Sequence, residues 1–453
     1  MSPSDWRTVK IDDIKAPTRS ALAMGPFGSN IKSDFFVPDG VPVVRGNNLN
    51  AERFEDSGFV FLTERKADEL LSANAFPDDI VFTHRGTLGQ VGIIPKNAKY
   101  DRYVVSQSQM KLTCNKEIVD PYFVFYLFRS PIGQHRLLQN TSTTGVPAIS
   151  QPLTSLRNID LFLPPLPEQH AIARILGSLD DKIELNRKTN ATLEAMAQAL
   201  FKSWFVDFDP VREKMEGREP AGMDAKTAAL FPDALEVVNG REVPEGWDIA
   251  PMSKIIEVNP RISLRKGDLA PYLDMKNMPT QGHRAIEWVE RPFGSGIKFA
   301  NGDTLLARIT PCLENGKTAY VDFLKAGQVG WGSTEYIVFR PKPPLPKEYG
   351  YYLARSENLR DYAIQNMTGT SGRQRVAASC FDSYLIVVPS PEVARPFEKI
   401  VKPLMTLIKR KDEESRTLAA LRDTLLPKLI SGEIRVPVNA VHQNTGDEIN
   451  AEP

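Results

Sequence analysis

Short apolar runs separated by turn residues dominate the first third of the chain. Residues 41–44, 59–62, 80–83 and 91–94 are rich in β-branched and aromatic side chains, and Gly, Pro, Asn and Asp lie between them. Runs of this length and composition are typical of β-strands. A stretch with apolar residues at helical spacing follows at 122–138. Residues 1–163 are therefore predicted to form a strand-rich α+β domain.

A second copy of this pattern lies about 225 residues further along the chain. Tyr-Leu-Phe-Arg-Ser at 126–130 recurs as Tyr-Leu-Ala-Arg-Ser at 352–356, and Gln139-Asn140 recurs as Gln365-Asn366. The spacing between matched segments drifts, so loops differ in length while the order of elements is kept. A repeat of this size indicates a duplicated domain. We expect the second domain to span residues 247–391.

Each copy is followed by a proline-rich break and a long heptad pattern. Apolar residues recur at spacings of three and four from Ile172 to Trp204, and again from Phe397 to Leu429. This spacing is the a/d seam of a coiled coil. Residues 164–206 and 392–432 are therefore predicted to be helices that pair antiparallel. Arg422 interrupts the second seam, and the neighbouring Leu421 is expected to fill that position.

Polar residues occupy the middle of both seams. If the helices pair antiparallel and centred, Asn186 and Asn190 face Lys411 and Ser415. A buried polar layer costs stability but fixes register, because a shifted pairing would place these groups against leucines. The alternative is that the two helices lie apart on the surface and their polar residues are solvated.

The fold class predicted from these patterns is α+β. Two pseudo-symmetric, strand-rich domains are separated by a two-helix antiparallel coiled coil. Residues 207–246, which are rich in Pro, Gly and charge, are expected to form an acidic connector, and residues 433–453 a disordered polar tail.

Composition excludes several classes of protein. No stretch reaches the length of uncharged apolar residues that a membrane helix needs. The three cysteines are far apart and lack CxxC spacing, which favours a reducing, cytoplasmic environment and argues against a disulfide framework or a zinc site. The phosphate-loop, HExxH and GxSxG motifs are absent, so we expect no catalytic residue, metal or cofactor in this chain.

Polar and basic side chains recur in equivalent loops of the two domains. Arginine reads guanine edges, Asn and Gln read adenine, and Lys, Ser and Thr contact phosphate. These loops are therefore candidates for contact with double-stranded DNA, although they are also compatible with an ordinary solvated surface. The candidates are Arg45, Asn47, Asn48, His84, Arg85, Gln90, Thr143 and Thr144 in the first domain, and Lys276, Asn277, Arg308, Asn315, Thr370, Arg373, Gln374 and Arg375 in the second.

Four motifs resemble those of type I restriction-modification specificity subunits. The strongest is Leu-Pro-Pro-Leu-Pro-Glu-Gln at 163–169, which leads into a helix with Leu-Asp-Asp-Lys-Ile-Glu-Leu-Asn at 179–186. Trp-Phe-Val-Asp-Phe-Asp-Pro at 204–210 and Leu-Leu-Pro-Lys-Leu-Ile-Ser-Gly-Glu-Ile at 425–434 also match. Gly-Pro-Phe-Gly-Ser at 25–29 looks like the usual opening of a target recognition domain in this family.

The resemblance implies a division of labour between chains. Each of two target recognition domains would read one half of an asymmetric, bipartite DNA site, and the helices would set the distance between them. Two modification (methyltransferase) subunits would dock on the helices and bring S-adenosylmethionine chemistry. Restriction (translocase/endonuclease) subunits would use ATP and Mg. The chain itself would not be an enzyme.

Two other readings of the sequence remain open. The formal net charge of zero favours, slightly, a coiled-coil scaffold that binds only proteins. A stand-alone nuclease or methyltransferase is disfavoured by the missing motifs.

Overall fold

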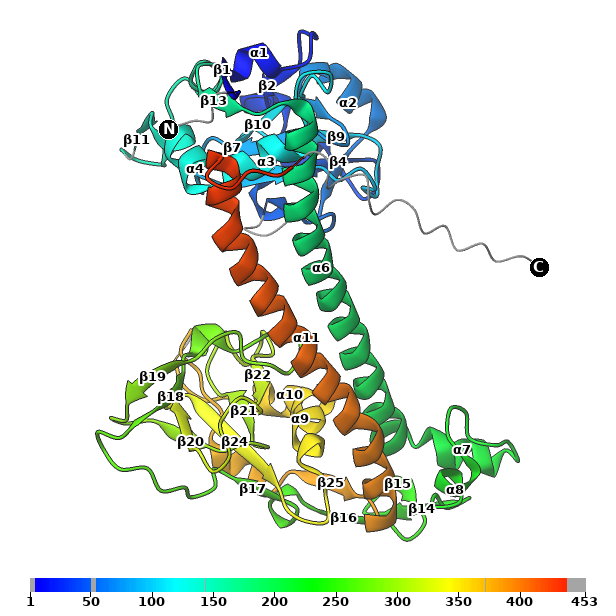
Figure 1. Ribbon diagram of the computed structural model, residues 1–453. Helices are drawn as coiled ribbons and strands as arrows, with labels where there is room; N and C mark the ends of the chain where they lie inside the picture. Colours follow the sequence, from blue (N-terminus) through cyan, green and yellow to red (C-terminus); the bar gives the residue numbers. More distant parts are fainter. Residues whose placement is uncertain (1–4, 50–53, 143, 371, 438–453) are drawn as a thin grey trace, which may run out of the picture. The chain divides into compact units, whose positions relative to one another are not determined.

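The chain forms two compact units, each containing one strand-rich domain and part of two long helices. The computed structural model describes residues 5–49, 54–142, 144–370 and 372–437. Unit 1 comprises Met1–Glu184 and Ser415–Pro453, and unit 2 comprises Leu185–Glu414 (Figure 1). Within the described residues, no helix combines the length and the apolar character that crossing a lipid bilayer requires.

Unit 1 contains two main sheets. In the five-stranded sheet the order is β3-β5-β4-β9-β6, and in the four-stranded sheet it is β2-β10-β7-β8. Strands β4 and β9 are parallel, and the other pairs are antiparallel. Short pairs β1-β13 and β11-β12 complete the domain. The strands are β1 (Arg7–Lys10), β2 (Leu22–Met24), β3 (Phe36–Val37), β4 (Val41–Val44), β5 (Val60–Leu62), β6 (Asn74–Ala75), β7 (Ile80–Thr83), β8 (Val91–Ile93), β9 (Tyr103–Val105), β10 (Gln109–Leu112), β11 (Thr141–Ser142), β12 (Ala148–Ile149) and β13 (Asp160–Leu163).

Two consecutive helices, α3 (Pro121–Arg129) and α4 (Pro131–Leu138), follow the sheets of unit 1. The carboxylate of Asp120 accepts hydrogen bonds from the first free amides of α3, and a proline at the first helical position fixes the backbone there. Ser130 ends α3 and caps α4 in the same way. Phe128 packs edge-on against Phe82 of β7, so α3 covers the four-stranded sheet. Unit 1 also contains α1 (Ile11–Ile14), α2 (Glu64–Glu69) and α5 (Pro152–Arg157).

Unit 2 repeats this topology. Its sheet order β17-β24-β21-β22 corresponds to β2-β10-β7-β8, and the parallel pair β18-β23 corresponds to β4-β9. Helices α9 (Lys347–Arg355) and α10 (Glu357–Gln365) follow, again with a serine between them. The predicted pair of related α+β domains is confirmed. The strands are β16 (Asp248–Pro251), β17 (Ile256–Val258), β18 (Leu269–Leu273), β19 (Val289–Pro292), β20 (Ile297–Phe299), β21 (Thr304–Ala307), β22 (Thr318–Tyr320), β23 (Gly330–Gly332), β24 (Tyr336–Pro341) and β25 (Leu385–Val388).

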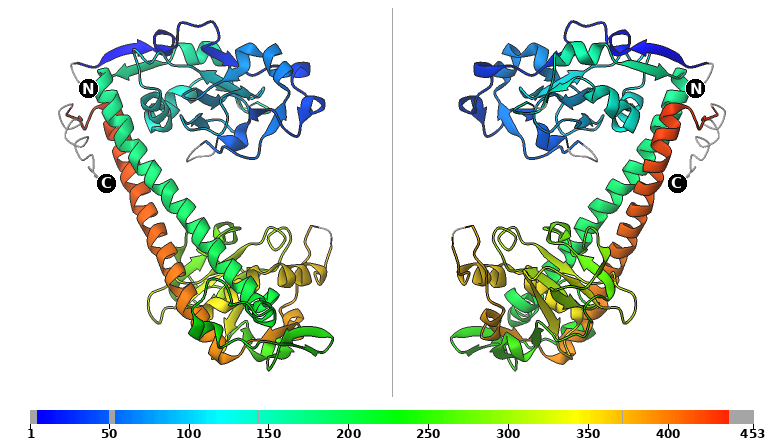
Figure 2. Two further views of the ribbon diagram at one scale, coloured as in Figure 1. Left: turned by 90° about the vertical axis from the view of Figure 1, so that its right-hand side faces the viewer. Right: turned by 90° about the vertical axis from the view of Figure 1, so that its left-hand side faces the viewer.

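The two long helices are α6 (Leu166–Lys202), which continues into a π-helical turn at Ser203–Asp207, and α11 (Pro391–Ser431). In unit 1 the early part of α6 packs against the late part of α11, since Ile172 and Leu429 share one core. In unit 2 the late part of α6 packs against the early part of α11, since Phe201 contacts Phe397. Within each unit the two helix segments are therefore antiparallel, as the heptads predict, and they lie side by side (Figure 2).

One position in the seam differs from the prediction. Arg422 is buried and pairs with Asp180, whereas Leu421 is 46% exposed. The guanidinium stays in the seam because a carboxylate on the facing helix compensates its charge, so a leucine is not needed there.

The segment expected to be a connector, 207–246, contains regular structure. It forms α7 (Asp209–Met215), α8 (Ala225–Ala228) and a hairpin of β14 (Leu235–Val238) and β15 (Arg241–Pro244). An Asn239-Gly240 turn with positive φ at both residues closes the hairpin. Phe208, Val211 and Phe231 join the core of unit 2, and this apolar anchoring explains the order.

The start of the predicted tail is fixed in place. Arg435 makes paired hydrogen bonds to Glu168 and to Asp5, and it lies over the ring of Trp6. The chain is therefore held in place to residue 435 by ion pairs that tie its two ends together within unit 1. Residues 438–453 lie outside the described ranges.

Candidate nucleic-acid interface

In unit 1, three loops are joined by main-chain hydrogen bonds. The amide of His84, just after β7, donates to Ser108 at 3.0 Å, and the amide of Ile149 donates back to His84 at 2.8 Å. Gly86 donates to Pro147 at 2.8 Å. The loops 84–90, 106–108 and 141–149 therefore converge, which brings Arg85 and Thr144, two candidate residues, into neighbouring loops.

Unit 2 contains three equivalent main-chain hydrogen bonds. Arg308, just after β21, donates its amide to Glu335 at 3.0 Å and accepts from the amide of Val376 at 2.9 Å. Thr310 donates to Gln374 at 3.0 Å. The loops 308–317, 333–335 and 368–376 thus correspond to those of unit 1, and Arg308 takes the position of His84.

A fourth loop is attached to this arrangement in both units. In unit 1 the amide of the Gln90 side chain donates to the carbonyl of Gly46 at 3.0 Å, at the start of the 3-10 turn η3 (Gly46–Asn48). In unit 2 the ammonium of Lys317 donates to Met275 at 2.7 Å, at the start of η7 (Met275–Asn277). We call the described residues of each set of four loops a recognition face: 45–48, 84–90, 106–108, 141–142 and 144–149 in unit 1, and 274–277, 308–317, 333–335, 368–370 and 372–376 in unit 2.

Three candidates in unit 1 build the face. Asn48 is fully buried; its side chain donates to the carbonyls of Glu55 and Ser57 and accepts from the amide of Arg45. His84 is also buried, which lowers the pKa of its imidazole, and Gln90 holds η3.

The assignment of Asn48 and His84 as DNA contacts is therefore corrected. The polar atoms of Asn48 are occupied inside the domain, and the buried imidazole of His84 has its Nε2 3.2 Å from the carbonyl of Gln107. The candidates that remain exposed in unit 1 are Asn47, Arg85 and Thr144, while Arg45 is half-buried and donates to Gly58. Thr143 lies outside the described residues.

In unit 2 two candidate arginines lie beside the same carboxylate. The guanidinium of Arg375 contacts both carboxylate oxygens of Glu335, with Nε at 2.9 and 3.0 Å, and Nε of Arg308 lies 3.8 Å from the same carboxylate. Lys276, Asn315, Thr370 and Arg373 are exposed, and Asn277 and Gln374 are half-buried.

The sequence prediction missed Glu335. Acidic side chains were not considered as part of a DNA-binding surface, yet this one holds two of the predicted arginines. Its position directly before β24, where Ser108 precedes Gln109 of β10 in the first domain, is the signal that would have found it.

The polar residues predicted in the seam contact the facing helix within unit 2. Asn186 donates to Glu414 at 2.9 Å, and Lys411 donates to Asn186 at 3.3 Å. Asn190 bonds to Asp412 at 2.8 Å, a partner that was not predicted. Ser415 is the first residue of the α11 portion that belongs to unit 1.

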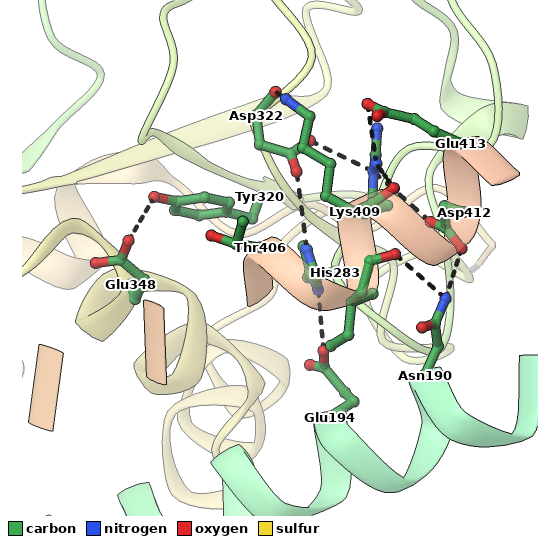
Figure 3. Close-up of polar contacts among 12 residues, drawn as sticks. Asn190, Glu194, His283, Tyr320, Asp322, Glu348, Thr406, Lys409, Asp412 and Glu413 are labelled. Carbon is green, nitrogen blue, oxygen red and sulfur yellow. Dashed lines mark hydrogen bonds and ion pairs between the residues drawn. The ribbon is translucent and has the colours of Figure 1, made fainter. Parts of the chain in front are cut away.

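Polar contacts also fix the strand-rich domain of unit 2 to its part of the helix pair (Figure 3). Nδ1 of His283 lies 3.0 Å from the carboxylate of Glu194 on α6. The neighbouring Arg284 donates to the carbonyl of Lys409 on α11 at 2.9 Å, and Lys409 donates to the carbonyl of Asp322 at 2.6 Å. His283 and Arg284 are buried. The loop that carries them follows η7, so the recognition face of unit 2 is linked to the helices.

In unit 1 a single carboxylate has the corresponding role. Asp180 of α6 accepts from the hydroxyl of Tyr126 at 2.9 Å, from Arg129 at 3.3 Å and from Arg422 of α11 at 2.7 Å. Since Tyr126 and Arg129 belong to α3, this buried cluster joins the domain to both helices.

Comparisons with known proteins agree with this architecture. The family model described as type I restriction modification DNA specificity domain matches residues 3–195. The HindI specificity subunit of Haemophilus influenzae is 28% identical over 396 residues, which cover 76% of this chain and 85% of the relative. The chain is therefore similar, over residues 3–195, to the type I restriction modification DNA specificity domain. The MjaIX specificity subunit of Methanocaldococcus jannaschii is 24% identical over 96% of this chain and 94% of its own length.

A solved specificity subunit has the same fold. The S subunit of a type I restriction-modification system from M. genitalium superposes with a TM-score of 0.54 at 17% identity, covering 94% of this chain and 96% of that one. This likeness shows that the fold is shared. The resemblance predicted from the motifs is confirmed by the family model and by the two relatives.

Proposed function

We propose that the two recognition faces read two different half-sites of one asymmetric DNA target. The observation that carries this proposal is the same four-loop arrangement in both units with different exposed side chains. Asn47, for example, corresponds to Lys276, and both are exposed. Two faces with the same backbone arrangement but different exposed side chains suit a bipartite DNA site whose two halves differ in sequence.

The exposed groups suit a nucleic acid. Arg85 in unit 1 and Lys276 and Arg373 in unit 2 are cationic and solvent-accessible, and Asn47 and Thr144 offer uncharged hydrogen-bonding groups. Cations and hydroxyls bind phosphate oxygens and fix the protein on the duplex, whereas Arg and Asn also recognise base edges in the major groove. Each face therefore combines groups for positioning with groups for sequence reading.

The helix pair would keep the two faces at a fixed spacing and provide the surface on which modification subunits dock. Its ends are fixed to the domains by the Asp180 cluster in unit 1 and the His283–Arg284 contacts in unit 2. S-adenosylmethionine, ATP and Mg would be bound by the modification and restriction partners.

Exchange of one domain tests the proposal. Residues 1–163 would be replaced by the matching domain of another specificity subunit, and methylated positions would be mapped in a genome that carries the hybrid complex. We expect one half-site to change while the other half and the spacing stay the same. A change in both halves would contradict independent reading by the two faces.

The net charge of zero favours, as a second candidate, a scaffold that binds only proteins. Retention of the complex on duplex DNA at increasing salt separates the two. A reader of DNA loses affinity steeply as salt rises, because phosphate contacts release counterions. A protein-only scaffold would show no retention at any salt concentration.

A further inference from the structure

The ion pair between Glu335 and Arg375 distinguishes the recognition face of unit 2 from that of unit 1. By the equivalent main-chain bonds, Glu335 of unit 2 corresponds to Ser108 of unit 1, and Arg375 corresponds to Ala148. Because neither Ser108 nor Ala148 is charged, the recognition face of unit 1 has no ion pair at these positions. The side chains of Glu335 and Arg375 are 24% and 39% exposed. They are therefore accessible at the surface while their mutual geometry is fixed.

The loop that carries Arg375 is itself closed by main-chain bonds. The amide of Thr368 donates to the carbonyl of Arg375 at 3.0 Å, and the amide of Arg375 donates back at 2.8 Å. Arg375 stands at the base of this loop, where it contacts the loop that begins at Arg308. Its backbone is thus anchored on two sides, which places the guanidinium on a rigid base.

The guanidinium of Arg375 has N–H donors that its contacts within the protein do not use. An arginine has five N–H groups. Nε–H and one N–H of Nη2 face Glu335, at 2.9 and 2.8 Å, and one N–H of Nη1 donates to the carbonyl of Arg373 at 3.0 Å. One N–H remains on each terminal nitrogen. The edge of a guanidinium formed by Nη1 and Nη2 is the one whose paired N–H groups match O6 and N7 of guanine in the major groove.

The carboxylate limits how this arginine moves. An arginine held by charge-assisted hydrogen bonds to a carboxylate loses the rotamers in which it would contact phosphates or other bases. Glu335 also lies beside Arg308, whose Nε is buried and has no hydrogen-bond partner among the described residues. One carboxylate therefore neutralises part of the positive charge of two arginines, which weakens sequence-independent attraction to phosphate.

We propose that Arg375 reads a guanine in the half-site of unit 2 and that Glu335 is the positioning residue that makes this reading selective. This inference rests on the proposed function, since it assigns a base contact to a face already taken as a reader of DNA. It places a G·C pair in the half-site of unit 2. It also predicts that the half-site of unit 1 is read without an arginine held by a carboxylate at this position.

Selection of binding sites from a pool of random-sequence duplexes tests the proposal with the full-length chain. The variants are Arg375→Lys, which keeps the charge but loses the two parallel donors, and Glu335→Gln and Glu335→Asp. Matched controls are Arg241→Lys on β15 and Glu257→Gln on β17, which change exposed residues of unit 2 outside the four loops of the recognition face. The half-site of unit 2 is identified as the one that stays the same when residues 1–163 are exchanged.

We expect Arg375→Lys to reduce the preference for guanine at one position by about tenfold or more, with the rest of the consensus unchanged. Glu335→Gln should weaken the same preference while raising retention of all sequences, and Glu335→Asp should restore part of it. The controls should select the wild-type consensus.

Two results would overturn the assignment while leaving the proposed function intact. One is a wild-type consensus that Arg375→Lys and Glu335→Gln leave unchanged. The other is an equal loss of affinity for every sequence in Arg375→Lys, which would make Arg375 a phosphate contact. If the wild-type chain enriched no sequence, the proposed function itself would fail, and the assignment of Arg375 with it.

Discussion

Nη1 of Arg422 on α11 lies 2.7 Å from Oδ1 of Asp180 on α6, and both side chains are buried in the seam of the helix pair. The positions related to them by the internal repeat are Ala197 and Met405, which are buried and apolar. The seam therefore differs in polarity between the two units, although the heptad pattern is shared.

Removing one partner of this pair should destabilise unit 1. Asp180→Ala leaves the Arg422 guanidinium buried with only the exposed Asp423 as a partner, and it also removes the acceptor of Tyr126 and Arg129. Loss of one member of a buried ion pair costs about 3–5 kcal/mol. Chemical unfolding followed by circular dichroism would measure the loss.

The double variant Asp180→Leu/Arg422→Leu is the matched control for this experiment. Replacing both charges by apolar groups is often neutral or stabilising. The double variant should therefore be more stable than Asp180→Ala. If the two were equally unstable, the cost would come from the lost tyrosine and Arg129 contacts and not from an unpaired charge.

The contact between Asn190 and Asp412 predicts a charge-dependent effect on stability. Asn190→Asp would place a second carboxylate about 3 Å from Asp412, and like charges at this distance repel. We expect a lower melting temperature at neutral pH and partial recovery at acidic pH, when one carboxylate of the pair takes up a proton. Asn190→Ala, which loses the bond without adding charge, should show no such recovery. Equal pH profiles for the two variants would contradict the prediction.

Burial of His84 predicts acid sensitivity. Burial lowers the pKa of its imidazole below the value of about 6.5 found in unfolded chains. Above that pH the residue is neutral in both states and has no effect. Below it the unfolded chain binds a proton that the folded chain resists, so stability falls as the pH drops.

The variant His84→Gln checks this origin of the acid sensitivity. Glutamine keeps a hydrogen-bonding side chain but does not titrate. Thermal melting from pH 7 to pH 5 should therefore give a shallower loss of stability than in the wild type. Identical slopes would show that other groups control the acid response.

The contacts of Arg435 predict where the chain can be shortened. Ending the chain after residue 434 removes both ion pairs and exposes Trp6, so the melting temperature should fall and tryptophan emission should shift to longer wavelength. Ending it after residue 437 keeps Arg435 and should leave both properties as they are in the full chain. A full chain carrying Arg435→Ala should behave like the shorter truncation.

Much of the architecture was predictable because it depends on periodic patterns. The heptads predicted the antiparallel helices, and the recurrence of Tyr-Leu-x-Arg-Ser predicted the duplicated domains. The order of segment 207–246 was missed because it depends on tertiary packing of a few apolar residues, such as Phe231, in a region whose average composition is polar.

The recognition faces were predictable only in part. The sequence pointed to loops that the structure brings together, since turn-rich segments after strands carry exposed polar groups. It could not separate Asn47, which is exposed, from Asn48, which is buried beside it, because both are polar residues in one turn. It also could not show that Glu335 reaches an arginine 40 residues away.

The convergence of three of the four loops depends on hydrogen bonds between main-chain atoms, which every residue except proline can donate. Side chains at the tips, such as Arg85 and Arg373, contribute nothing to those bonds. Under the proposed function, new target sequences are therefore open to evolution through a few tip substitutions, with no refolding of the scaffold, and the same positions offer engineers a small library for retargeting.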